Sequence, residues 1–229
     1  MTKRQLSAAG LVWLVAVSCH AATITDPIPY LSISDTPDGF FDHPGVYCFQ
    51  DFENPDGPWE AGFTIDAGMR IGPKFISGAG IPVTDSVDAD DNAIDGDGTM
   101  GSSWFSRTVS LSITFDDPTW IASFVLTDGD LRATKVTVSA YDSDNNLLVS
   151  RDYDADFLDD VYTGTTQEDR FFGVNGGDTP VKRISVAIDA GNGLEIDHIQ
   201  FLKPIPEPAS IALLTLGLFA LCGMRSRQR

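Results

Sequence analysis

The sequence predicts an all-β domain, folded as a two-sheet antiparallel sandwich, with a short apolar segment near each end of the 229-residue chain. Between residues 23 and 203, apolar and polar residues repeatedly alternate with a period of two, the spacing of strands that bury one face. Clusters of Asp, Asn, Gly and Pro separate these stretches, as turns do. No long amphipathic helical pattern interrupts them. Many short strands with one polar face indicate two packed sheets.

The first 22 residues have the organisation of a secretory signal peptide. Lys3 and Arg4 give a basic start, residues 8–18 form an apolar core, and the small residues Ala21 and Ala22 precede polar sequence. We expect cleavage after Ala22 or one residue earlier. The folded domain is therefore placed at residues 23–203.

Strands and turns can be assigned in order along this domain. Alternation predicts strands at residues 46–52, 109–115, 121–127, 135–140, 147–153, 170–174, 184–188 and 194–201. Turn residues are found at 116–118, 128–130, 142–146, 175–178 and 191–193. The last strand changes phase, because Ile196 and Ile199 have opposite parity. A β-bulge near Asp197 and His198 would bring both isoleucines to one face.

The last 26 residues, 204–229, form a separate segment. They read P-I-P-E-P, then a 16-residue apolar run at 209–224, then R-S-R-Q-R. As a helix, the run would span roughly 24 Å, short for a bilayer core of about 30 Å but within what snorkelling and local thinning accommodate. Arg225, Arg227 and Arg229 predict a cytoplasmic C-terminus. We therefore expect a short transmembrane helix at 209–224 and an Arg-rich tail at 225–229.

Pro206, Glu207 and Pro208, with the apolar run and the arginines behind them, resemble the PEP-CTERM sorting signal. This signal is found on exported proteins of Gram-negative bacteria that also make extracellular polysaccharide. The resemblance implies recognition by an exosortase, a membrane-embedded transpeptidase-like protease that processes the tail near the motif. It also implies export across the inner membrane, transient anchoring there, and then a location at the cell surface or in the medium. Exopolysaccharide is the partner that this setting suggests.

A second resemblance concerns the domain itself. The stretch E-I-D-H-I-Q-F at residues 195–201 is similar to the last strand of jelly-roll carbohydrate-binding modules. In those modules an Asp of the last strand and acidic residues near the first strand hold a structural calcium. The resemblance implies a jelly-roll-like sandwich with Asp51, Glu53 and Asp197 as Ca²⁺ ligands. These residues meet only if the first and last strands are neighbours, and the alternative is an ordinary polar strand face.

Another candidate cation site lies in a stretch that holds six Asp residues in 13 positions, 85–97. Oxygen-rich, cysteine-free loops of exported proteins suit Ca²⁺. The EF-hand pattern fails, because Ala93 and Ser102 stand at the third and twelfth positions counted from Asp91. The alternative is a solvated acidic loop. The candidate ligands are Asp88, Asp90, Asp95 and Asp97.

The predicted domain is strongly acidic. Five of the chain's 15 Lys and Arg residues lie in the terminal segments, as does one of its 33 Asp and Glu residues, so residues 23–203 carry a net charge of −22. Such a charge argues against nucleic acid and anionic membrane surfaces as partners. Cys48 is the single cysteine of this domain, so we expect no internal disulfide and a buried thiol in a strand.

Signals for catalysis are weak. Ser102 and Ser103 lack the context of a nucleophile elbow, and carboxylates are too numerous for a glycosidase pair to be chosen. We interpret His198 as a hydrogen-bonded structural histidine. Aromatic side chains that could stack on sugar rings are Trp59, Trp104, Trp120, Tyr141, Tyr153 and Tyr162. We therefore expect a non-enzymatic structural or exopolysaccharide-associated protein, with a calcium-stabilised carbohydrate-binding module and a secreted hydrolase as alternatives.

Overall fold

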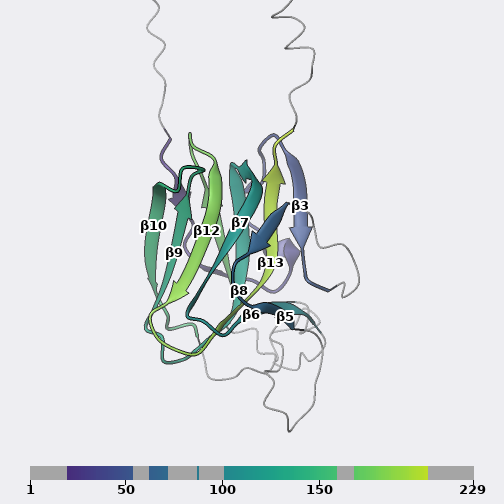
Figure 1. Cartoon of the computed structure of the whole chain (residues 1–229). Coiled ribbons are helices and arrows are strands. Elements are labelled where there is room, and N and C mark those ends of the chain that lie inside the picture. The colour runs from purple at the N-terminus through teal and green to yellow at the C-terminus, as the bar shows by residue number, and fades with distance from the viewer. Residues whose placement is uncertain (1–19, 54–61, 72–86, 88–100, 159–167, 206–229) are drawn as a thin grey trace, which may run out of the picture.

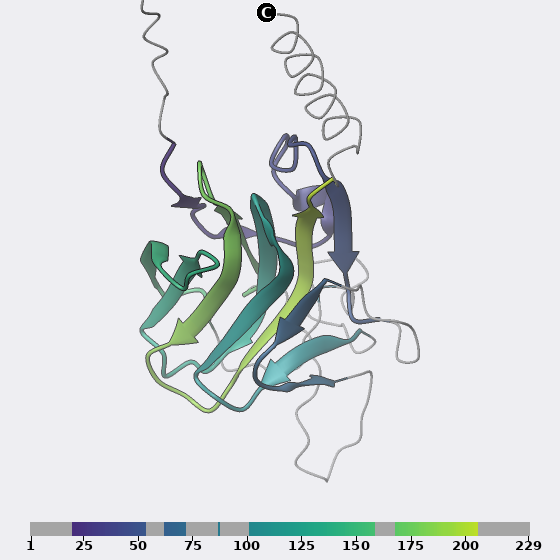
Figure 2. The ribbon, with the colours of Figure 1, turned by 45° about the horizontal axis from the view of Figure 1, so that its top comes forward.

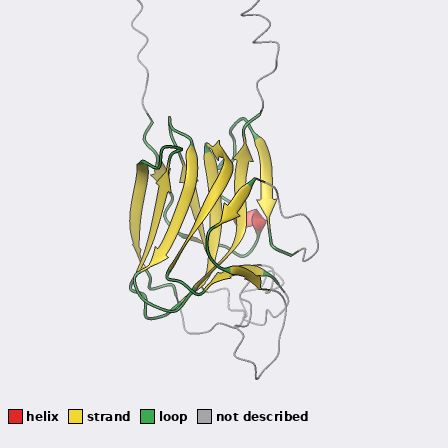
Figure 3. Ribbon diagram, viewed as in Figure 1, coloured by secondary structure: helices red, strands yellow, loops and turns green. Residues whose placement is uncertain are grey.

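The computed structural model describes residues 20–53, 62–71, 87, 101–158 and 168–205. These residues form strands and one three-residue 3-10 helix, η1 (Ile33–Asp35) (Figure 3). Ser32 caps this helix in a reciprocal arrangement, because its hydroxyl accepts the backbone N–H of Ser34 while Asp35 accepts that of Ser32. The expectation of an all-β domain with little helix is confirmed for the described part of the chain.

Two antiparallel sheets pack face to face (Figure 1). Sheet A has the order β1 (Thr23–Ile24), β11 (Arg170–Asn175), β8 (Ile121–Gly129), β13 (Leu194–Lys203), β6 (Ser103–Ser106) and β5 (Met69–Ile71), with β2 (Ile28–Pro29) also paired to β11 and β3 (Val46–Gln50) to β13. Sheet B has the order β10 (Leu147–Asp154), β9 (Lys135–Tyr141), β12 (Val181–Ile188), β7 (Ser110–Thr119) and β4 (Phe63–Ile65).

The strand order is that of a jelly roll. In sheet A, β3, β13, β8 and β11 are successive neighbours, and in sheet B the same holds for β7, β12, β9 and β10. Among these eight strands, every connection except β9–β10 passes from one sheet to the other. This arrangement is the double Greek key of jelly-roll sandwiches. The prediction of a jelly-roll-like sandwich is confirmed, and its first and last long strands, β3 and β13, are neighbours.

The main core lies between the sheets and is built from alternate residues of each long strand. Phe124 and Phe172 stack at 5.3 Å between ring centroids, and Phe115 and Phe201 lie 5.1 Å apart. Cys48 is buried in β3, as expected, and its thiol donates to the Val46 carbonyl oxygen at 3.6 Å. The apolar residues that repeat with a period of two in the sequence therefore form the inner faces of the sheets.

A smaller apolar cluster covers the outer face of sheet A. Tyr30 stacks on Phe171 at 5.9 Å, and both pack with Val87 and Val125. Phe40 adds an edge-on contact with Phe171 at 5.4 Å. The Pro- and Asp-rich segment before β3 thus acts as a third layer. It explains why nine of the ten residues of β13 are buried.

Two predicted turns overlap strands by more than one residue. Residues 128 and 129 belong to the end of β8. Residues 116–118 belong to β7, and the chain reverses at Trp120 instead. The ladder between β7 and β12 is irregular there, because Val181 pairs with Thr119 while Arg183 pairs with Thr114. Asp and Pro fit a ladder poorly, and here they mark a bulge within a strand rather than its end.

No helix of the described residues is long and apolar enough to cross a membrane. Most of the predicted signal peptide (residues 1–19) and the segment 206–229, with the motif, the apolar run and the arginines, lie outside the described residues. His20 and Ile205, the first and last described residues, leave the sandwich at the same end, the upper one in Figures 1 and 2.

Candidate functional site

The predicted bulge in β13 is present. His198 has a φ of 42°, and the register of β13 against β8 shifts between Asp197 and Gln200. The shift lets Ile196 and Ile199 both face the main core. His198 is buried, and its Nδ1 lies 3.1 Å from the Tyr30 hydroxyl. This contact agrees with the interpretation of His198 as a structural histidine.

A buried polar network surrounds the bulge. The Gln200 side chain accepts hydrogen bonds from Thr36 at 3.2 Å and from Tyr47 at 2.9 Å, and its amide donates to Tyr30 at 3.2 Å. Burial raises the pKa of Tyr47 to about 12 and that of Tyr30 further still. Both hydroxyls therefore stay protonated. The network joins the covering segment to β13.

The residues proposed as ligands of a first calcium site lie where β3 and β13 adjoin. Asp197 is buried, and its two oxygens accept the backbone N–H groups of His198 at 2.7 Å and of Val87 at 3.1 Å. Asp51 accepts the N–H of Glu53 at 3.1 Å. Among the described residues, no three His, Cys, Asp or Glu side chains come together as a metal-binding group.

The second predicted calcium site is represented in the described residues by Val87 alone. Val87 is buried, and its backbone N–H donates to Asp197. The four candidate ligands of this site, Asp88, Asp90, Asp95 and Asp97, lie outside the described residues.

A second buried polar cluster, not predicted from the sequence, lies beside the first residues of β13, where this strand pairs with β6. Ser103 donates its hydroxyl to the carboxylate of Glu195, which is 1% exposed. Arg70 donates to the Ser102 hydroxyl at 2.7 Å and to the Phe52 carbonyl oxygen at 2.5 Å. The two serines are thus fully buried hydrogen-bonding groups. In sequence, a buried acidic residue shows only as a polar residue at an otherwise apolar position of a strand. That pattern does not identify the groups to which it bonds.

The candidate sugar-stacking aromatics have different environments. Trp104 donates its indole N–H to the Ala67 carbonyl oxygen at 2.7 Å, and it lines a cavity of about 280 Å³ together with residues 63–65. The Arg183 guanidinium lies over the ring of Tyr141 at 3.8 Å. Tyr153 is buried, whereas Trp120 is 39% exposed. Trp59 and Tyr162 lie outside the described residues.

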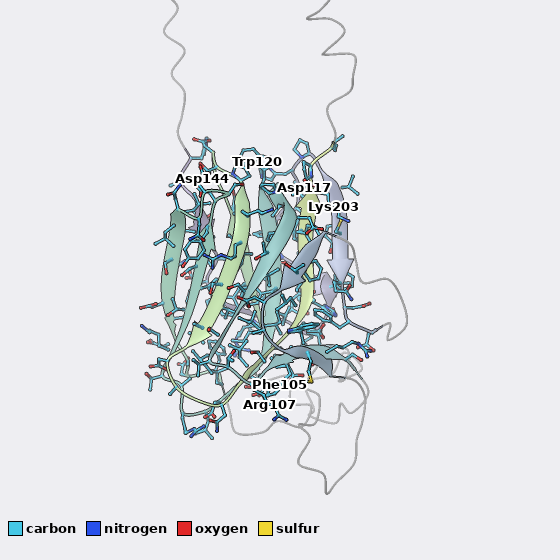
Figure 4. All side chains as sticks on the ribbon, viewed as in Figure 1. Phe105, Arg107, Asp117, Trp120, Asp144 and Lys203 are labelled. Carbon is cyan, nitrogen blue, oxygen red and sulfur yellow. The ribbon has the colours of Figure 1, made fainter. Side chains whose placement is uncertain are left out.

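Trp120 belongs to a surface at which both ends of the described chain leave the sandwich. We call this surface the exit face; it consists of the exposed and half-buried residues 116–118, 120, 177–178, 20–22, 203–205 and Val46. Figure 4 shows Trp120, Asp117 and Lys203 together at this end, opposite Phe105 and Arg107.

Comparison with known proteins identifies one motif. The PEP-CTERM protein-sorting motif matches residues 204–228. A comparison with curated proteins finds no match.

Two solved structures show distant similarity. One contains the CBM32-1, CBM32-2 and M60 catalytic domains of Clostridium perfringens ZmpB, with 17% identity and a TM-score of 0.35, over 81% of this chain and 17% of that one. This chain therefore matches only a small part of the length of that protein. The other is the K2 cleaved adhesin domain of Lys-gingipain, with 9% identity and a TM-score of 0.38, over 68% of this chain and 97% of that one. The chain therefore carries a PEP-CTERM sorting motif directly after the last strand of its sandwich.

Proposed function

We propose that this protein is an exported, non-enzymatic structural or exopolysaccharide-associated protein of the cell surface or extracellular matrix. The observation that supports it is the position of the sorting motif. The motif match begins at residue 204, and β13 ends at Lys203, so an entire jelly-roll domain precedes the signal. The motif implies export and processing by an exosortase, with the domain as the part that is delivered.

The described polar residues favour a structural role over a catalytic one. His198, Ser102 and Ser103 are buried and engaged in hydrogen bonds that join strands and covering segments. A nucleophile or general base needs access to a substrate, which these side chains lack as placed. The strongly acidic surface suits a soluble matrix component.

Intact-mass analysis of the exported protein tests the proposal. We expect a mass that lacks the signal peptide and has been altered near Pro206–Pro208. Replacement of Arg225, Arg227 and Arg229 by Asp should weaken retention of the C-terminus and reduce processing, since the positive-inside bias is lost. An exported wild-type protein that keeps its full C-terminal mass would contradict the exosortase part of the proposal.

A calcium-stabilised carbohydrate-binding module is the second candidate. Two observations favour it: β3 and β13 are neighbours, and the backbone N–H of Val87 donates to Asp197. Asp51, Glu53 and Asp197 supply hard oxygen ligands of the kind that Ca²⁺ takes, and a carboxylate accepts more than one bond. When bound, the ion would neutralise carboxylate repulsion. A glycan array probed with and without EDTA separates this candidate from the first, because only a calcium-dependent module binds sugar in an EDTA-sensitive way.

A further inference from the structure

The sorting motif begins directly after the folded domain in sequence, at residue 204. β13 remains paired to its last residue, because Lys203 is in register with Val46 of β3. In sequence, Pro206 follows Lys203 by three residues and Pro208 by five. Five residues reach at most about 18 Å when fully extended, which is less than the diameter of a globular domain of 100 residues, whose radius of gyration is about 13 Å. An enzyme that grips residues 206–208 is therefore large enough to contact the sandwich end beside Lys203.

Hydrogen bonds hold this end of the sandwich together. Thr119 is fully buried, and its hydroxyl donates to the Leu202 carbonyl oxygen at 2.8 Å. The next residue, Trp120, accepts the Gly176 N–H at 2.9 Å through its own carbonyl oxygen. Asp178 in turn bonds the backbone of His20, donating to its carbonyl oxygen at 3.0 Å and accepting its N–H at 2.6 Å. Trp120 thus lies between the two points where the chain leaves the domain.

The composition of the exit face suits a protein partner. Trp120, Val46 and Ile205 are 39%, 54% and 57% exposed. Asp117 and Asp178 are exposed acidic groups on the same face. Tryptophan is the residue type most often found at the energetic centre of interfaces, and charged rims steer a partner of opposite charge.

We propose that the exit face, with Trp120 as its anchor, is the docking surface for the membrane-embedded protease that processes the tail. This inference rests on the proposed function, because it presupposes that the motif is processed. The protease surface that meets the exit face should carry a pocket for an indole ring and a basic rim. The protease then recognises both the motif and the folded domain.

The test measures the rate at which the full-length chain is processed in its own host, by pulse labelling and intact mass. Trp120→Ala should slow processing about tenfold or more, the effect of losing 1.4 kcal/mol of docking free energy, and Trp120→Phe should restore most of the rate. Asp117→Lys, a surface change that leaves the apolar contacts intact, should slow processing several-fold. Leu131→Ala, at an exposed residue in the loop after β8 at the opposite end, is the matched control and should leave the rate unchanged.

Thermal denaturation of each exported variant checks that the domain is folded. If folded Trp120→Ala and Asp117→Lys proteins are processed at the wild-type rate, the docking proposal is overturned while the sorting function stands. If the wild-type tail is never processed, both fail together. Trp120-dependent binding of the exported protein to phosphatidylcholine vesicles, with processing unaffected, would identify the bilayer as the partner and overturn the protease assignment.

Discussion

Removal of the Tyr153 hydroxyl tests how one edge of the sandwich is closed. Tyr153 lies on β10, the edge strand of sheet B, and donates to the Thr25 carbonyl oxygen just after β1 of sheet A at 2.7 Å. Tyr153→Phe deletes this bond and keeps the packing of the ring against Phe172 at 5.4 Å. A hydrogen bond of this kind contributes about 0.5–1.5 kcal/mol, which predicts a melting temperature about 1–6 °C lower for a domain of this size.

The neighbouring Arg151 also joins β10 to the segment around β1, through its charged guanidinium. Its guanidinium donates to the Ile24 carbonyl oxygen at 2.7 Å and to the Asp26 carboxylate at 2.6 Å. The double variant with Arg151→Ala should therefore release β1, a two-residue strand. Amide exchange at residue 24 should become faster, while exchange in β8 should stay slow, because β1 opens locally.

Urea denaturation provides the measurement, and Tyr141→Phe provides the control. Tyr141 lies on the adjacent strand β9, and its hydroxyl makes no hydrogen bond to the described residues, so the same chemical change should leave stability within about 0.5 kcal/mol of wild type. Equal losses in the two variants would refute the idea that the Tyr153 hydroxyl joins the sheets.

Three further predictions concern calcium, pH and the core. Millimolar Ca²⁺ should raise the melting temperature of the EDTA-treated protein, because a free calcium concentration of a hundred times Kd stabilises the folded state by about 2.7 kcal/mol. Asp197→Ala should abolish part of the shift. The absence of both a shift and calorimetric heat would exclude binding. The Arg132 guanidinium beside Asp130 lowers the pKa of that carboxyl, so its stabilising effect is present above the ordinary Asp value of about 3.9 and is lost as pH falls below it. The stability difference between wild type and Asp130→Asn should therefore shrink in acid titrations, and a difference that grows would contradict this sign. Phe172→Ala should lower the free energy of unfolding by about 3–5 kcal/mol, since the ring is fully buried and stacked on Phe124, and a loss under 1.5 kcal/mol in urea titrations would show a poorly packed core.

Long strands such as β7 and β12 could be predicted because they bury one face more than the other. Leu111, Ile113 and Phe115 alternate with polar residues, and all three are in the main core. The bulge in β13 was also predictable, since a phase change within a continuous strand requires an extra residue. The short strands β1, β2, β4, β5 and β6 were not predicted, because two to four residues are too few to show a period.

The covering layer on sheet A was not predictable from periodicity. Tyr30 and Phe40 lie in a segment with no regular pattern, and their positions depend on pairing with strands far along the chain. The neighbouring positions of β3 and β13 followed from a resemblance rather than from the local pattern. Pairing between the ends of a chain is a property of the topology, so local sequence carries little information about it.

The place of β13 in sheet A also determines when the domain can fold. This last strand pairs with β8 on one side and with β6 and β3 on the other, and it brings together Tyr47 and Gln200, 153 residues apart in sequence. Contacts of such long range make folding slow, because most of the chain must be present before they form. The sorting motif at residues 204–228 follows β13 directly. Synthesis from the N-terminus therefore supplies the central strand of sheet A last among the strands of the domain, so the sandwich is completed only as the sorting motif is being made.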